Sequence, residues 1–183
     1  TGQHNVRNAM AAAAAAGHVG IDVSVSCEAL GKFDGVKRRM ELLGSVNGIS
    51  VYDDFAHHPT AIKTTLDGFA AKLRSTRSSY RLVAVIEPRS ATMKSGVHQD
   101  KLVEACVAAD EVLWYQGEDI GLDFKSLVSS SVFESQVFSS VQEIVAFLAN
   151  SCRSGDHIIV MSNGGFEGIH DKLLSSLNSV GVK

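Results

Sequence analysis

Short apolar runs along the chain predict the strands of a buried β-sheet. Residues 82–86, 112–115 and 157–161 are almost continuously apolar, which is typical of parallel strands that are covered on both faces. Residues 132–138 form a fourth run. Two further strand-like segments, 38–44 and 49–54, are separated by Asn47 and Gly48, and an Asn-Gly pair is a strong signal for a β-hairpin turn.

Apolar residues between these runs recur every three or four positions, which is the spacing of an amphipathic helix. The stripe over residues 59–73 consists of Ile62, Leu66, Phe69, Ala70 and Leu73. Shorter stripes include Leu102, Ile144 and Leu173, whereas residues 116–131 are rich in Gly, acidic residues and Ser and are expected to form a loop. Alternating strands and helices predict an α/β fold with a Rossmann-like, mostly parallel sheet, helices on both faces and an N-terminal β-hairpin.

The first part of the chain differs from the rest in composition. Residues 5–16 are rich in Ala and predict a helix that ends at Gly17, and Asp22 is placed to cap a second helix that ends near Leu30. Neither helix carries enough large apolar residues to build a core of its own. The sequence therefore divides into a helical segment, residues 1–33, and an α/β domain, residues 34–183.

Composition and charge exclude several classes of protein. The 183 residues are 45% hydrophobic and 20% charged, which is ordinary for a globular domain and not for a disordered chain or a coiled coil. A net charge of -3 gives no general attraction to nucleic acid or to an anionic membrane. The three cysteines are far apart and form no CxxC pair, which favours a reducing cytoplasm over a disulfide framework or a zinc site. Because the chain starts at Thr1 without a secretory signal, we interpret it as a piece of a longer protein.

Candidate chemistry gathers where the predicted strands end, which is the usual ligand-binding edge of such a sheet. Residues 53–58 contain two carboxylates and two imidazoles, which suit a ribose, a phosphate or a proton transfer. The alternative is that Asp53 or Asp54 merely caps the helix after Pro59. A zinc site built on His57 and His58 is disfavoured, because no cysteine is near.

Two more strand-end loops carry possible anion sites. Arg89 and Lys94 could bind a carboxylate or a phosphate, or could be solvated surface charges. Residues 163–168 resemble a dinucleotide fingerprint, but Asn163 replaces its first glycine; the glycines could let the backbone approach an anion or could simply form a tight turn. A P-loop pattern is missing from the whole sequence.

Polar residues earlier in the chain leave two further possibilities open. Asn5 and Asn8 lie one helical turn apart, so that their amides could bind a base edge or could simply be exposed. Arg38 and Arg39 precede the hairpin, where they could bind a ligand or protect a sheet edge from pairing.

The ordered set of segments resembles the C-terminal part of the Mur ligases, the ATP-dependent amide ligases of peptidoglycan assembly. The resemblance covers essentially the whole chain, with residues 2–9 like the end of the family's central ATPase domain and residues 36–41 like the start of its C-terminal domain. Residues 53–60 (Asp-Asp-Phe-Ala-His-His-Pro-Thr) are similar to the loop of the branch that acts on UDP-N-acetylmuramate. Residues 87–94 and 161–166 are similar to the enzymes of that branch that attach the recycled tripeptide L-alanyl-γ-D-glutamyl-meso-diaminopimelate.

This resemblance implies ligation through an acyl phosphate, with ATP and Mg2+ as cofactors and UDP-N-acetylmuramate and the murein tripeptide as substrates. It implies four nucleotide contacts, from Asn5, Asn8, Arg39 and Asp54. It places His57 and His58 near the reacting phosphate, and it assigns the incoming peptide to Arg89, Lys94, Asn163, Gly164, Gly165 and Glu167. The metal ligands, the P-loop and the UDP-binding domain would lie in N-terminal and central domains outside this chain, which we expect to be inactive alone.

Two other functions stay open at this point. One is another amide ligase of the same superfamily, such as the alanine-adding enzyme or a folylpolyglutamate synthetase. The other is a Rossmann-like nucleotide-binding module without catalysis. The presence of a P-loop upstream of Thr1 in the encoding frame would favour a ligase over the module.

Overall fold

The computed structural model describes residues 3–33, 35–76, 79–89, 91–95, 99–118 and 120–179, and the side chains of residues 3, 4, 92 and 94 lie outside this description. The chain divides into two compact units, Thr1–Val36 and Lys37–Lys183, and each is described by itself. This division falls three residues after the boundary predicted from the sequence. In the described part, no helix is long and apolar enough to cross a membrane.

The first unit is a pair of helices, α1 (Gln3–His18) and α2 (Val23–Gly31). Asp22 caps α2 as predicted, because its carboxylate accepts a hydrogen bond of 2.8 Å from the backbone N–H of Ser24. The predicted end of α1 at Gly17 is wrong by one residue, since the helix continues to His18. Large apolar side chains are exposed on this unit, namely Val6, Met10, Val19, Ile21, Val23 and Val25.

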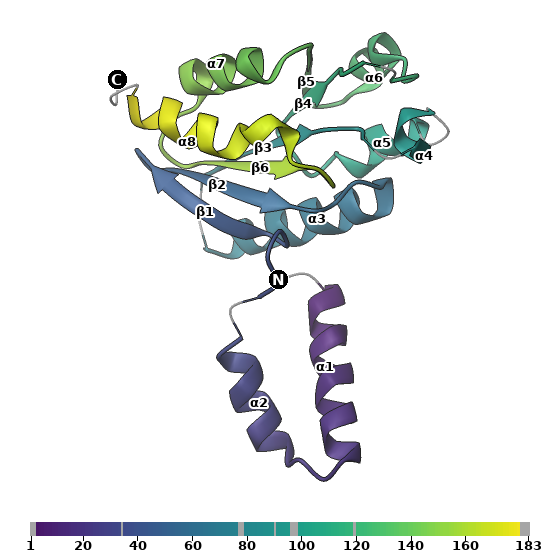
Figure 1. Cartoon of the computed structure of the whole chain (residues 1–183), viewed down its shortest axis with the longest axis vertical. Coiled ribbons are helices and arrows are strands. Elements are labelled where there is room, and N and C mark those ends of the chain that lie inside the picture. The colour runs from purple at the N-terminus through teal and green to yellow at the C-terminus, as the bar shows by residue number, and fades with distance from the viewer. Residues whose placement is uncertain are drawn as a thin grey trace. The chain divides into compact units, whose positions relative to one another are not determined.

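The second unit contains a six-stranded sheet with the order β1-β2-β6-β3-β4-β5 (Figure 1). Its strands are β1 (Glu41–Val46), β2 (Ile49–Asp54), β3 (Arg81–Ile86), β4 (Glu111–Tyr115), β5 (Glu134–Phe138) and β6 (Asp156–Met161). β1 and β2 form an antiparallel hairpin, and every other neighbouring pair is parallel. This arrangement confirms the predicted fold class, including the N-terminal hairpin.

Helices cover both faces of this sheet, as Figure 1 shows. They are α3 (Pro59–Thr76), α4 (Ala91–Lys94), α5 (Gln99–Ala105), α6 (Phe124–Ser130), α7 (Val141–Ser151), the 3-10 turn η1 (Phe166–Gly168) and α8 (Ile169–Ser179). Alternate residues of each strand point to opposite faces. On β3, Ala84 packs with α3 and α5, whereas Val83 and Val85 pack with α7 and α8.

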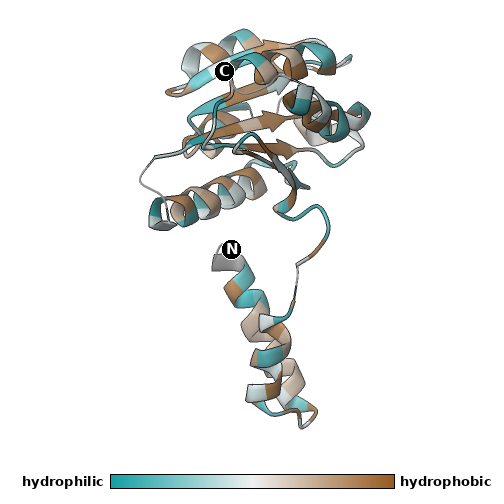
Figure 2. Ribbon diagram, turned by 90° about the vertical axis from the view of Figure 1, so that its left-hand side faces the viewer, coloured by the Kyte–Doolittle hydropathy of each residue, from teal (hydrophilic) through white to brown (hydrophobic). Residues whose placement is uncertain are grey.

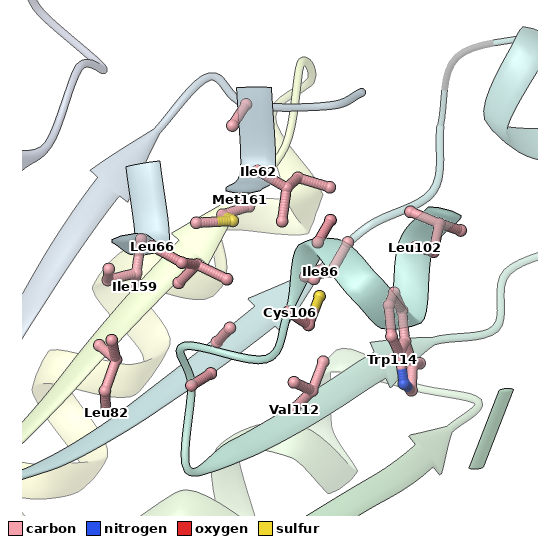
Figure 3. Packing of buried hydrophobic residues seen from close by; sticks show 14 of the residues in the cluster. Ile62, Leu66, Leu82, Ile86, Leu102, Cys106, Val112, Trp114, Ile159 and Met161 are labelled. Atoms are coloured by element: carbon pink, nitrogen blue, oxygen red, sulfur yellow. The ribbon is translucent and has the colours of Figure 1, made fainter. Parts of the chain in front are cut away.

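The two resulting clusters form the core of the second unit. The strands of the sheet are the most apolar part of its ribbon (Figure 2). Figure 3 shows the cluster under α3 and α5, in which Ile62 and Leu66 of α3 meet Ile159 and Met161 of β6. The helical stripe predicted for residues 59–73 therefore faces the sheet.

Three predicted elements differ from the structure. The expected loop over 116–131 contains α6, because Asp123 caps a short helix that buries Phe124 and Leu127. β1 begins at Glu41 rather than at residue 38, since Arg38 and Met40 have φ values of 58° and 52°, which an extended strand does not allow. β5 begins at Glu134, two residues later than expected.

Candidate functional site

The central strands β2, β6 and β3 end side by side, which brings three of the candidate loops to one edge of the sheet. Asp54 at the end of β2 pairs with Met161 at the end of β6, and Met161 also pairs with Ile86 at the end of β3. The loops that start after these three residues therefore leave the same edge, which we call the charged edge. It is formed by residues 53–58, 87–89 and 162–167, together with the segment 38–40 that precedes β1.

Asp54 organises its own loop. Its carboxylate is 2% exposed and accepts hydrogen bonds from the backbone N–H groups of Met40, at 2.9 Å, and Ala56, at 2.8 Å. Burial raises the pKa of Asp54, while these two amides and the positive charge of Arg39 act in the opposite direction. The Thr65 hydroxyl of α3 adds a bond of 3.3 Å. These bonds hold the Asp54 loop but do not cap α3, so that the helix-capping alternative is wrong for Asp54. Its role toward a ribose stays a prediction.

The two histidines of the loop differ in setting. His57 is half-buried, and its Nδ1 lies 2.8 Å from the backbone oxygen of Phe55. Because a carbonyl can only accept, Nδ1 carries the proton, and Nε2 of the neutral ring is left as an acceptor. His58 is exposed, and its Nδ1 accepts from the N–H of Thr60 at 3.4 Å.

Arg38 rather than Arg39 makes the specific contacts at this edge. Its Nε donates to Asp53 Oδ2 at 2.9 Å, and its Nη2 donates to the backbone oxygens of Ser162, at 2.7 Å, and Gly164, at 2.8 Å. The guanidinium carbon also lies 5.1 Å from the centre of the Phe55 ring, within the range of a cation–π contact. Arg39 is exposed, so that its side chain is accessible to a ligand.

Asp53 also faces α8. Its Oδ1 lies 3.4 Å from Nε2 of His170, although this approach lacks hydrogen-bond geometry. Burial lowers the pKa of His170, and the negative charge of Asp53 opposes that effect. His170 follows no predicted strand directly and was not selected from the sequence.

Arg89 lies across the turn that follows β6. Its guanidinium is half-exposed, with Nη1 3.9 Å from Glu87 Oε1, and a Cβ atom built on Gly164 would overlap with its Nη1, Cζ and Cδ. Glu87 in turn accepts a hydrogen bond from the hydroxyl of Ser162, and that hydroxyl accepts one from the N–H of Gly164 at 2.9 Å. Arg89 and Gly164, both predicted as peptide ligands, are therefore in contact.

The remaining predicted peptide ligands lie on the same turn or nearby. Asn163 is partly buried, and its Oδ1 is enclosed without a hydrogen-bond partner among the described residues. Gly165 is exposed. The side chain of Lys94 lies outside the described residues.

Glu167 belongs to a turn with unusual backbone angles. Phe166 and Glu167 have φ values of 43° and 49°, which are uncommon for residues other than glycine and cost energy unless the surroundings enforce them. The Phe166 ring is buried, and the Tyr115 hydroxyl donates to Glu167 Oε1 at 2.9 Å. That bond is the main cause of a raised pKa of Tyr115, followed by burial and by the charges of Glu167, Glu87 and Glu118.

Asn5 and Asn8 are both exposed on α1, in the first unit. Their predicted contact with adenine therefore stays a prediction, independent of the charged edge. Within the described part of the chain, the structure holds no group of three or more His, Cys, Asp or Glu residues that could bind a metal ion.

Five residues that build or contact the charged edge were not selected from the sequence: Arg38 in its specific role, Glu87 and Ser162 within the edge, and Tyr115 and His170 beside it. Ser162 and Glu87 follow strands β6 and β3 directly, so that the strand-end rule could have included them. Arg38 contacts residues 124 and 126 positions away, and the sequence holds no local signal of that pairing.

The fold and this edge define a doubly wound α/β domain that offers arginines, carboxylates and imidazoles to a ligand at the carboxyl ends of its strands. Known proteins narrow this class further. Residues 38–164 match the family model "Mur ligase, glutamate ligase domain". The chain belongs to the Mur ligase family, as a C-terminal domain preceded by two helices.

The similar proteins include two ligases named UDP-N-acetylmuramate--L-alanyl-gamma-D-glutamyl-meso-2,6-diaminoheptandioate ligase. The protein from Haemophilus influenzae is 43% identical over 96% of this chain, and that from Escherichia coli is 44% identical over the same share. A crystal structure of a murein peptide ligase from Psychrobacter arcticus covers 100% of this chain with 47% identity and a TM-score of 0.76. The chain spans 38% of the length of each of these three proteins.

Proposed function

We propose that this chain is the C-terminal part of an ATP-dependent amide ligase that joins L-alanyl-γ-D-glutamyl-meso-diaminopimelate to UDP-N-acetylmuramate, in the recycling of peptidoglycan. The observation that carries the proposal is the 43–44% identity, over 96% of the chain, to two ligases whose names state these substrates. The charged edge supports it, because the reaction needs one face that collects a nucleotide, a carboxylate and an amine.

The residues of the charged edge fit the phosphates and ribose of ATP. Arg39 is exposed there and can compensate phosphate charge, and the protonated form of His57 can donate a hydrogen bond to a phosphate oxygen through Nε2. Arg39 and Asp54 would hold the ribose. The contact of Asn5 and Asn8 with adenine is a separate proposal for the first unit. ATP supplies the phosphoryl group that activates the muramate carboxylate, and His57, with His58 beside it, would orient that phosphate through ring nitrogens.

The incoming tripeptide would bind on the other side of the edge. Arg89 offers a planar guanidinium to one of its carboxylates, and Glu167 offers a carboxylate to an ammonium. Asn163, with its enclosed Oδ1, and the backbone of Gly164 and Gly165 would complete this subsite. Lys94, whose side chain lies outside the described residues, stays a predicted ligand of the same peptide. The peptide amine would then face the activated carboxylate, while Arg89 and Glu167 compensate the other charges of the peptide.

The described residues do not fit a Mg2+ site, because no cluster of three metal-binding side chains occurs among them. We place the Mg2+ ligands, the P-loop and the UDP-binding residues in N-terminal and central domains of the same protein. This division of labour is consistent with a chain that spans 38% of the length of its relatives. We also propose a cytoplasmic location, where ATP and nucleotide-linked sugars are found.

A ligation assay tests the proposal directly. The full-length protein that contains this chain, given ATP, Mg2+ and UDP-N-acetylmuramate, should form product with the tripeptide and much less with L-alanine. The 183-residue chain alone should form none. Preferred use of L-alanine would instead support the alanine-adding activity, and product formation by the chain alone would contradict the proposed division between domains.

Substitutions of two exposed arginines, Arg39 and Arg89, test the nucleotide subsite and the peptide subsite separately. Arg39→Ala should raise the Michaelis constant for ATP. Arg89→Ala should raise that for the tripeptide, through a loss of about 2–4 kcal/mol of binding free energy if Arg89 pairs with a desolvated carboxylate. Each variant is the control for the other. An unchanged tripeptide constant in Arg89→Ala would remove Arg89 from the site.

A further inference from the structure

The segment that carries Arg39 and the turn that carries Asn163 are joined by one side chain, that of Arg38. The Arg38 backbone is fixed first, because its N–H donates to Glu41 at 2.8 Å and its carbonyl accepts from Phe55 at the same distance. Its φ of 58° costs energy that these bonds offset. The side chain is thereby fixed at the junction between β2 and β6.

The Arg38 guanidinium then fixes the turn after β6. It donates to the backbone oxygens of Ser162 and Gly164 and is held by Asp53. Two carbonyls and one carboxylate in this arrangement need a planar group with several donors, which a lysine ammonium does not reproduce. The turn at residues 162–164 is therefore held by the segment that carries Arg38 and Arg39.

The opposite side of the same turn supports Arg89. The Arg89 side chain lies where a Cβ of Gly164 would be. Any shift of Gly164 therefore moves the surface on which the Arg89 guanidinium rests. Contacts run without a break from Arg38 through Gly164 to Arg89.

We infer that Arg38 is a positioning residue, which sets the location of Arg89 through the turn at residues 162–164 and so controls the affinity for the acceptor peptide. This inference rests on the proposed function for its substrate, but not for its geometry. Arg38 acts through its neighbours, because its guanidinium already donates three hydrogen bonds to groups of the protein. Arg38, although it is next to the nucleotide ligand Arg39 in sequence, thus supports the peptide subsite.

Arg81 offers a matched control for this role. Its side chain is 29% exposed against 32% for Arg38, and it also bridges groups from neighbouring strands, Glu111 and Asp156. Arg81 begins β3, however, and so lies at the opposite edge of the sheet. A purely structural arginine is therefore compared with a positioning one at equal burial.

The first experiment uses the 183-residue chain and needs no substrate. Amide hydrogen exchange at Gly164, whose N–H bonds to Ser162, should become at least tenfold faster in Arg38→Met and less so in Arg38→Lys. Arg81→Lys should leave exchange at Gly164 unchanged, although it lowers the melting temperature. Unchanged exchange at Gly164 in both Arg38 variants would overturn the inference, whatever the protein's activity.

The second experiment uses the full-length protein and measures the Michaelis constants separately. Arg38→Lys should raise the constant for the tripeptide at least tenfold and that for ATP less than threefold, while Arg81→Lys changes neither. Equal constants in Arg38→Lys and the wild type would overturn the positioning role. If the wild type makes no product from the tripeptide, the proposed function fails, and the exchange experiment still decides whether Arg38 holds the turn.

Discussion

Gly164 illustrates how a single residue can matter through what it lacks. Arg89 occupies the space that a Cβ at Gly164 would need, whereas a Cβ at the adjacent Gly165 would meet nothing within 4 Å. Neither glycine has a positive φ value in the structure. An alanine at either position is therefore compatible with the backbone, and only the one at position 164 displaces a functional side chain.

We predict that Gly164→Ala weakens tripeptide binding without unfolding the domain. The methyl group would push the flexible end of Arg89 away, so that the Michaelis constant for the tripeptide should rise about tenfold, which corresponds to about 1.4 kcal/mol. The melting temperature and the constant for ATP should stay close to those of the wild type. Gly165→Ala is the matched control, and an equal effect of both substitutions would show that Arg89 does not rest on Gly164 during binding.

Single residues also mark where the sequence stops being informative. Asp54, His57 and Arg89 could be selected in advance, because each follows a predicted strand in a loop with a proline. The choice between Arg38 and Arg39 could not be made, since it depends on which guanidinium reaches carbonyls that are 124 and 126 residues away. The roles of Asn5 and Asn8 likewise depend on contacts that no local pattern specifies.

At the scale of elements, periodicity was sufficient for the long helices and buried strands. The stripe from Ile62 to Leu73 specifies α3, and the apolar runs specify β3, β4 and β6, because burial on both faces leaves no other pattern. The short α6 escaped detection, since only two of its residues, Phe124 and Leu127, are buried apolar positions, which is too few to show a stripe. The start of β1 was missed because two non-glycine residues adopt left-handed angles, held by contacts from distant strands.

Helix α7 allows a stability prediction at this scale. Ser140 and Glu143 form a capping box, with the Glu143 N–H donating to the serine oxygen at 3.2 Å and the Ser140 N–H donating to the glutamate at 3.2 Å. Ser140→Ala should lower the free energy of unfolding by about 0.5–2 kcal/mol, because it removes one cap of the first turn.

Urea denaturation of the 183-residue chain would measure this loss. Ser129→Ala is a suitable control, because the Ser129 hydroxyl is exposed and bonds only to the backbone of its own helix. Its effect should stay within about 0.5 kcal/mol. A Ser140→Ala variant as stable as the control would mean that the cap contributes nothing to the folded state.

At the scale of the whole molecule, the two units differ in how they are stabilised. Both buried clusters lie entirely within Lys37–Lys183, and among the described residues none of their members belongs to the first unit. The first unit instead exposes large side chains such as Met10 and Val19. The sequence predicted this contrast, because residues 1–33 lack the apolar residues of a core.

Removal of residues 1–36 should therefore leave the stability of the second unit almost unchanged. We expect its free energy of unfolding in urea to differ from that of the whole chain by less than about 1 kcal/mol, since the removal takes away no member of either buried cluster. Leu113→Ala in the same shortened chain should cost about 2–5 kcal/mol and so demonstrates that the assay can detect core damage. A large loss on removal of residues 1–36 would instead show that the helices support the α/β unit.

The central place of β6 also bears on how the domain forms during synthesis. Asp156–Met161 is the last of the six described strands in chain order, and it inserts between β2 and β3, which are made far earlier. Until it emerges, the hairpin has no parallel neighbour, and the loops that carry Asp54 and Arg89 cannot be brought together. Before β6 has been made, the nascent sheet therefore lacks the strand between β2 and β3. Its ligand-binding edge forms only once β6 is in place.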